Sequence, residues 1–255
     1  MELEVGNIFE VDFDTGDAKS EVFATFERLY GDFTLNDAYS LRVGKFQTPV
    51  GRWNLVPAEP FVWTATQPVL LDSFDEHQTG AMAFGTFFPG RGELSYWLYG
   101  QFIEPFDVEA DEEPADYSVG GRLEYTRLVS SWSIGSSFLA ASEGGSWSYL
   151  GGLDGQVELG PFEGTMELVY RDGGIEEGLW DIYLQAVYEI VPTLYFVSRY
   201  EHSDPLGSTP PVNIGDVGLT WIPEQYLIFK ATYRFADHPV EGDPAGFKAT
   251  FSALF

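Results

Sequence analysis

The sequence predicts an all-β fold, a transmembrane antiparallel up-and-down β-barrel of about 14 strands, and three observations predict it. Apolar and polar residues alternate with a period of two through most of the 255-residue chain, whereas helical periodicity is nearly absent. The alternating segments are about ten residues long, which is what a tilted strand needs to cross a bilayer. Short connections alternate with longer ones. We treat residues 1–255 as a single domain.

The stretch LIFKATYRF shows the alternation clearly. Phe229, Tyr233 and Phe235 fall on one side, and Lys230 and Arg234 fall on the other. Applied along the chain, the same pattern gives an even number of strands, as bacterial barrels require. The expected strands are residues 2–13, 21–33, 39–50, 79–88, 93–102, 118–126, 131–140, 149–159, 162–171, 179–189, 193–202, 212–221, 225–235 and 245–255.

The connections between these strands are of two kinds. Short turns rich in Pro and Gly are expected at 89–92, 160–161, 191–192 and 222–224. Longer polar loops are expected at 104–116, 142–148, 172–178, 203–211 and 236–244. The pattern is typical of barrels with short periplasmic turns and longer extracellular loops, and it places both chain ends on the periplasmic side.

The apolar face of the strands is rich in aromatic residues, which make up 16% of the chain. We expect this face to touch lipid, with its end residues forming an aromatic girdle at each interface. The expected girdle residues are Trp132, Tyr188, Trp221 and Phe255 at the periplasmic edge and Phe102, Tyr170, Trp180, Tyr200 and Phe235 at the outer edge. The alternative is a soluble β-sandwich or lipocalin-like barrel, but such cores favour Val, Ile and Leu over aromatics.

The net charge of the chain limits the kinds of partner that it can bind. The chain has 13 Lys and Arg against 40 Asp and Glu, a net charge of −27, so its surface repels nucleic acid phosphates. Because there is no cysteine, disulfides and thiolate metal sites are excluded.

Two short stretches resemble known families. The final strand, GFKATFSALF, ends on Phe255 and resembles the assembly signal of bacterial outer-membrane barrels. In LRVGKFQTPVGRWN, residues 41–54, the positions Gly44, Lys45, Phe46, Pro49 and Gly51 resemble a stretch of porins similar to the phosphate-selective O/P family. That resemblance implies a lysine-lined path for anions. This chain is strongly acidic and has fewer strands, so phosphate selectivity is not carried over.

The longest connection, residues 52–77, is too apolar for a solvated loop. One interpretation is that it folds into the lumen and forms the constriction of a channel. The other is that it packs over the rim or against a neighbouring subunit. The candidate constriction residues are Trp53, Phe61, Trp63, Asp72 and Asp75.

Strand phase assigns the residues expected to line the pore. The acids are Glu2, Glu4, Glu10, Asp12, Glu93, Glu124, Asp154, Glu158, Glu163, Glu167, Asp181, Glu189, Glu201 and Asp216. The bases are Arg42, Arg122, Arg171, Arg199, Lys230, Arg234 and Lys248. Arg199, Lys230 and Arg234 suggest a basic wall, opposed by an acidic one, across a wetted lumen that is net negative and favours cations. A lumen salt bridge that only supports the wall is the alternative for each residue.

No cofactor is expected. The acidic loop around Asp107–Asp116 is a candidate site for Ca²⁺ or Mg²⁺, although it lacks calcium-loop spacing and a charge run of this kind is usually just solvated. The three histidines, His77, His202 and His238, are not placed beside an activated nucleophile, and the common catalytic motifs are absent. We therefore do not expect an enzyme.

The sequence thus predicts a porin of the outer membrane of a Gram-negative bacterium, for passive diffusion of small hydrophilic solutes or ions. The alternative is a structural barrel that anchors a partner protein in an outer-membrane complex, such as an electron-transfer or surface assembly. The expected partners are outer-membrane lipid, the solutes, the outer-membrane assembly machinery, and a second copy or another protein.

Overall fold

The chain forms strands along most of its length. The structure, a computed structural model, describes residues 2–11, 18–56, 62–103, 115–127, 131–174, 178–238 and 245–253, with the backbone alone for 2–11 and 18–27. The described strands are β1 (Glu2–Val11), β2 (Ala18–Asn36), β3 (Tyr39–Gln47), β4 (His77–Phe87), β5 (Gly92–Gln101), β6 (Tyr117–Arg127), β7 (Trp132–Glu143), β8 (Ser146–Leu159), β9 (Phe162–Gly173), β10 (Leu179–Val191), β11 (Leu194–Pro205), β12 (Val212–Glu224), β13 (Leu227–Ala236) and β14 (Gly246–Ala253). Two 3₁₀ turns, η1 (Trp53–Leu55) and η3 (Val69–Ser73), lie between β3 and β4.

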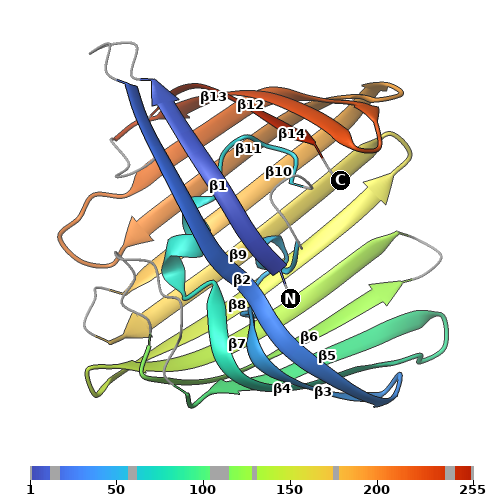
Figure 1. Cartoon of the computed structure of the whole chain (residues 1–255), viewed down its shortest axis with the longest axis vertical. Helices are drawn as coiled ribbons and strands as arrows, with labels where there is room; N and C mark the ends of the chain where they lie inside the picture. Colours follow the sequence, from blue (N-terminus) through green and yellow to red (C-terminus); the bar gives the residue numbers. More distant parts are fainter. Residues whose placement is uncertain are drawn as a thin grey trace.

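Each strand pairs antiparallel with the next one in the chain, in the order β1 to β14 (Figure 1). The predicted all-β, up-and-down arrangement is confirmed. Within the described ranges, β1 pairs only with β2, and β14 pairs only with β13. Closure into a cylinder and the exact strand number therefore stay predictions. No helix in the described part of the chain is long and apolar enough to span a membrane.

Short and long connections alternate between the two ends of the strands (Figure 1). Residues 160–161, 192–193 and 225–226 link strands at one end, and 48–76, 206–211 and 237–245 link them at the other. The expected loop at 142–148 is wrong, because β7 runs to Glu143 and β8 begins at Ser146. Only Gly144 and Gly145 remain between them, with φ of 55° and 83°, which suits a tight two-residue hairpin turn.

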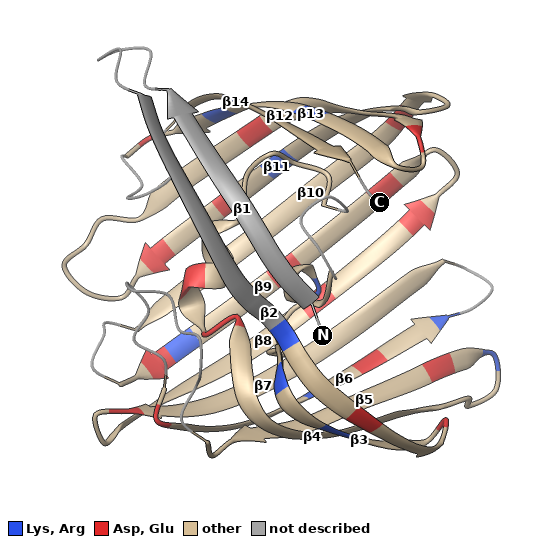
Figure 2. Cartoon of the chain, viewed as in Figure 1, with Lys and Arg blue, Asp and Glu red and all other residues tan. Residues whose placement is uncertain are grey.

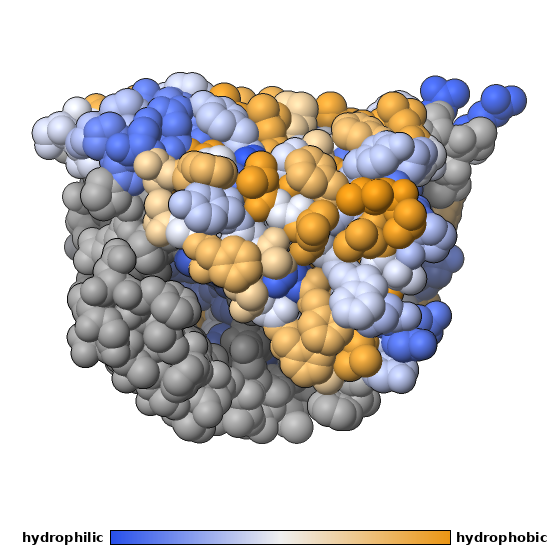
Figure 3. All heavy atoms as spheres, turned by 90° about the horizontal axis from the view of Figure 1, so that it is seen from above, coloured by the Kyte–Doolittle hydropathy of each residue, from blue (hydrophilic) through white to orange (hydrophobic). Residues whose placement is uncertain are grey.

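The two faces of the strands differ as the alternation predicts. On β13, the aromatic side chains of Phe229, Tyr233 and Phe235 are exposed, whereas Lys230 and Arg234 are buried. Figure 3 looks onto the side where β12–β14 lie in Figure 1 and shows hydrophobic residues gathered across the middle of this outer face, with hydrophilic residues towards its left and right edges. The exposed girdle residues are Phe102, Tyr170, Tyr188, Tyr200, Trp221 and Phe235. Trp132 and Trp180 are half-buried, and Phe255 lies outside the described residues.

The stretch Gly44–Gly51 is where the chain leaves the sheet. At Gly44, φ is +133°, and a Cβ would lie 2.2 Å from the Leu29 carbonyl oxygen, so only glycine permits this approach to β2. The expected strand 39–50 is therefore too long, since β3 ends at Gln47. Residues 48–56 and 62–76, called the first and second halves of the inturned segment below, then lie against the inner face of the strands.

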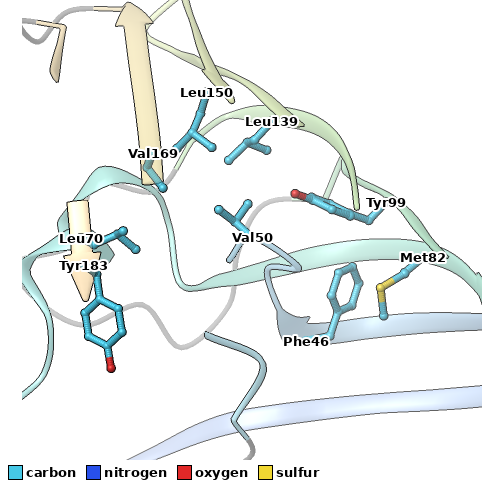
Figure 4. Close-up of a cluster of buried hydrophobic side chains, with 9 residues drawn as sticks. All are labelled: Phe46, Val50, Leu70, Met82, Tyr99, Leu139, Leu150, Val169 and Tyr183. Carbon is cyan, nitrogen blue, oxygen red and sulfur yellow. The ribbon is translucent and has the colours of Figure 1, made fainter. Parts of the chain in front are cut away.

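A buried apolar cluster joins the inturned segment to the wall (Figure 4). Val50 and Leu70 come from the segment, and the wall contributes Phe46, Met82, Tyr99, Leu139, Leu150, Val169 and Tyr183. A lumen that is wetted throughout is therefore wrong, because inward apolar side chains of β3 to β10 are covered by the segment.

Candidate functional site

The candidate site is the inner face of the sheet together with the inturned segment. The first half of the segment contacts β7 and β9, through Ser137 and Glu167. The second half contacts β11, β12 and β13, through Arg199, Asp216 and Thr232. The described parts of the segment thus contact strands from β7 to β13.

Glu167 of β9 anchors the first half. Its Oε1 accepts a hydrogen bond from the backbone N–H of Trp53 at 2.7 Å, and the side chain is almost fully buried. Gly51 has φ of +64°, and its N–H donates to Ser137 Oγ at 3.3 Å. A Cβ at Gly51 would lie 2.1 Å from Glu167 Oε2, so the carboxylate occupies the space that the glycine leaves.

A second set of charges lies beside this anchor. Arg122 of β6 makes two bonds to Asp154 of β8, at 2.5 Å and 2.8 Å, and one to Glu124 at 2.7 Å. Arg52, from the inturned segment, lies 3.5 Å from Glu124 and donates to Ser133 Oγ at 2.9 Å. Two guanidinium groups therefore face two carboxylates, and the set is neutral.

Two arginines hold the second half of the segment. Arg199 and Arg234 both bind Asp216, and Arg199 Nε lies 2.8 Å from Glu201 Oε1. Arg199 Nη1 donates to the Thr66 carbonyl oxygen at 2.8 Å, and Arg234 Nη2 donates to that of Gln67 at 3.0 Å. Their guanidinium groups thus bind wall carboxylates and segment carbonyls together.

Further contacts join the segment to neighbouring strands. Ser73 Oγ donates to Asp181 Oδ2 at 2.5 Å, and Arg171 Nη1 donates to the Ser73 carbonyl oxygen at 3.3 Å. Trp63 Nε1 donates to Glu163 Oε1 at 3.0 Å, and its ring lies 4.9 Å from that of Tyr195.

The inward charged residues are therefore mostly packed rather than open to solvent. Arg122, Asp154, Glu167, Asp181, Arg199, Glu201, Asp216, Lys230 and Arg234 are buried. An exposed basic wall of Arg199, Lys230 and Arg234 is not formed, because the two arginines are neutralised by Asp216 and Glu201. Figure 2 shows acidic positions spread over many strands.

The remaining candidate residues lie nearer the strand ends or on other strands. Glu93 accepts from Ser95 at 3.2 Å, Glu158 is exposed, and Glu189 and Lys248 are half-buried. Asp72 is exposed, and Asp75 Oδ2 accepts from the N–H of Ala115 at 3.0 Å.

Arg42 has a partner that strand phase did not assign. It forms a two-bond pair with Asp32, 2.8 Å at each contact, and these residues face each other across β2 and β3. Opposite charges that face each other on neighbouring strands commonly pair, and this rule would have identified Asp32 as the partner of Arg42.

Some residues that the sequence singles out lie outside the part of the chain that the structure describes. Phe61, most of the acidic loop and the side chains of Glu2, Glu4, Glu10 and Asp12 are among them. In the ranges that the structure describes, no group of three or more His, Asp and Glu is arranged to hold a metal ion. His77 begins β4 and His202 lies within β11, so neither is in a loop.

Comparison with known proteins gives the fold. No protein-family model matches the chain, and no curated protein matches its sequence. The chain is similar to OmpF of Salmonella typhi in complex with daunomycin, with a TM-score of 0.66 and 11% identity over 98% of this chain and 95% of that one. It is similar to an anion-selective porin of Comamonas acidovorans, with a TM-score of 0.59 and 14% identity over 98% and 80%. It is also similar to OmpT, an outer-membrane protein of Vibrio cholerae, with a TM-score of 0.59 and 10% identity over 92% and 77%.

These likenesses show the fold of bacterial outer-membrane β-barrels. Together with the exposed apolar face, that fold indicates a chain of the bacterial outer membrane. The likeness of residues 41–54 to the phosphate-selective O/P family stays a prediction.

Proposed function

We propose that the chain is a passive channel of the outer membrane for small hydrophilic solutes and ions, without a catalytic step. The observation that carries the proposal is the inturned segment, which lies against the inner face of a wall whose outer face is apolar. Such a segment would narrow a polar pore that runs beside it. The architecture that this chain shares with OmpF and with the Comamonas porin supports the same reading.

We further propose a preference for cations. Each of the two arginine sets is balanced by carboxylates, so the charge that remains comes from other inward residues. Those are mainly acidic: Asp72, Glu93, Glu158, Glu163, Glu167, Asp181 and Glu189, against Arg171, Lys230 and Lys248. A net negative interior raises the local concentration of cations and lowers that of anions.

Conductance in planar lipid bilayers tests both parts. We expect stepwise increases in current, and a reversal potential in a potassium chloride gradient with the sign of a cation-preferring pore. Absence of any conductance from folded protein would contradict the channel, whereas an anion-type reversal potential would contradict only the preference.

A second candidate function is a structural barrel that anchors a partner protein. The packed apolar cluster across the interior favours it, because a scaffold needs no open path. Co-purification of a stoichiometric partner with a barrel that does not conduct would support this candidate over the channel.

A further inference from the structure

We propose that Glu167 is the positioning residue of the inturned segment, whose first half it fixes by presenting a carboxylate to a backbone nest at Gly51–Trp53. The proposal rests on the channel function proposed above, because it names the group that decides where the narrowing element lies.

The backbone at this turn is shaped to receive an anion. Gly51 is left-handed, with φ of +64°, and Arg52 follows in the right-handed region, with φ of −99° and ψ of −38°. Successive residues of opposite handedness direct their N–H groups towards one point and form an anion-binding concavity. At this turn Glu167 Oε1 accepts from the N–H of Trp53 at 2.7 Å, whereas the N–H of Gly51 donates to Ser137 Oγ.

The wall and the segment are matched at this contact. Any side chain on Gly51 would meet Glu167, since its Cβ would lie 2.1 Å from Oε2. Glu167 is 1% exposed, and its Oε2 has no hydrogen-bond partner among the described residues. Burial of a carboxylate costs free energy unless hydrogen-bond donors compensate its charge. The N–H donors of the turn therefore stabilise the buried carboxylate, and the carboxylate stabilises the turn.

The same turn is held from the other side by apolar packing. Val50 precedes Gly51, is fully buried and packs in the cluster with Leu139 and Val169 (Figure 4). Removal of the carboxylate leaves residues 50–53 restrained by this packing and by the bonds of Gly51 to Ser137 and of Arg52 to Ser133. We therefore expect the first half of the segment to open more often, while the second half stays bound to Arg199 and Arg234.

A single cysteine reports this opening independently of conduction. The chain has no cysteine, so Val50→Cys introduces one thiol, at a position that is fully buried. We expect Glu167→Ala and Gly51→Ala to raise the rate of maleimide labelling in detergent micelles by about tenfold or more, as loss of a charge-assisted bond implies. Glu167→Gln keeps a carbonyl acceptor but loses the charge, so its labelling rate should lie between those of the parent and Glu167→Ala, about two- to fivefold above the parent.

Glu224→Ala is the matched control, because Glu224 is an exposed carboxylate at the end of β12. Labelling of folded Glu167→Ala no faster than the control would overturn the proposal. If Glu167→Ala does not fold, Gly51→Ala and Glu167→Gln decide it by the same rates. Parent protein that labels as expected but does not conduct would contradict the channel and leave the positioning role of Glu167 standing.

Discussion

Arg234 of β13 and Asp216 of β12 lie directly opposite each other and join through two hydrogen bonds, Nε to Oδ1 at 2.9 Å and Nη2 to Oδ2 at 2.8 Å. Arg199 of β11 is the register partner of Asp216 on the other side. One carboxylate thus sits between two guanidinium groups in a single row across three strands. Because all three side chains are buried, the row depends strongly on its charge balance.

Asp216→Ala should therefore destabilise the protein. It leaves two buried guanidinium groups with Glu201 as the acid beside them, and we expect the free energy of unfolding to fall by about 3–5 kcal/mol. Urea unfolding in detergent micelles, followed by tryptophan fluorescence, measures the change. Asp216→Leu combined with Arg234→Met leaves Arg199 paired with Glu201 and should recover most of the loss. A double variant no more stable than Asp216→Ala would contradict this account of the row.

The contact between Ser73 and Asp181 predicts a cross-link. Ser73 Oγ lies 2.5 Å from Asp181 Oδ2, and both residues are buried. Ser73→Cys together with Asp181→Cys should be joined by a short bifunctional thiol reagent in folded protein, since the chain has no other thiol. Mass spectrometry after proteolysis detects the link. Ser73→Cys alone should give no linked peptide, and failure of the pair to react in folded protein would place the second half of the segment elsewhere.

The strands could be predicted closely because their signal is local. The expected strand 162–171 is observed as Phe162–Gly173, and the expected strand 225–235 as Leu227–Ala236. A period of two needs only neighbouring residues to be recognised. The error at β3 has a local cause as well, since Pro49 lies inside the expected strand 39–50 and Gly51 directly follows it.

The interior was harder to predict because it depends on contacts between distant residues. Strand phase shows that Arg199 faces inward, but not that Thr66 and Asp216 will surround it. Leu139 and Leu150 face inward, next to polar residues of their own strands. They are buried because they form one apolar cluster with Val50 of the inturned segment, which is a contact between residues distant in the sequence. The sequence therefore predicted which faces are polar, but not which charges are neutralised.

The start of the connection after β13 predicts an effect of pH. The side chain and the backbone N–H of Asn213 donate to Asp237, at 2.6 Å and 2.8 Å, and these bonds hold the pKa of that exposed carboxyl below its usual range. A depressed pKa in the folded state means that the contact stabilises at neutral pH and is lost only as pH falls through the folded-state value.

Asn213→Ala removes the side-chain bond and keeps the backbone bond, so it should return the pKa of Asp237 part of the way towards the ordinary value near about 4. Carboxyl ¹³C chemical shifts followed across a pH titration measure it. His238→Ala keeps both Asn213 bonds and should leave the pKa depressed. An Asp237 that titrates at the same pH in Asn213→Ala and in the parent would show that the side chain of Asn213 is not the cause.

Arg52 predicts how the charge of the interior sets selectivity. It is the basic group of the inturned segment beside Glu124, at 3.5 Å, and its side chain is 29% exposed. Because the pair is partly solvated, Arg52→Ala should change stability by about 1 kcal/mol or less. The loss of one positive charge near the path should raise the cation-to-anion permeability ratio by about two- to fivefold. Reversal potentials in a salt gradient measure the ratio, and Arg52→Lys, which keeps the charge, is the control. A ratio that stays constant in Arg52→Ala, or moves towards anions, would mean that ions do not pass beside the first half of the segment.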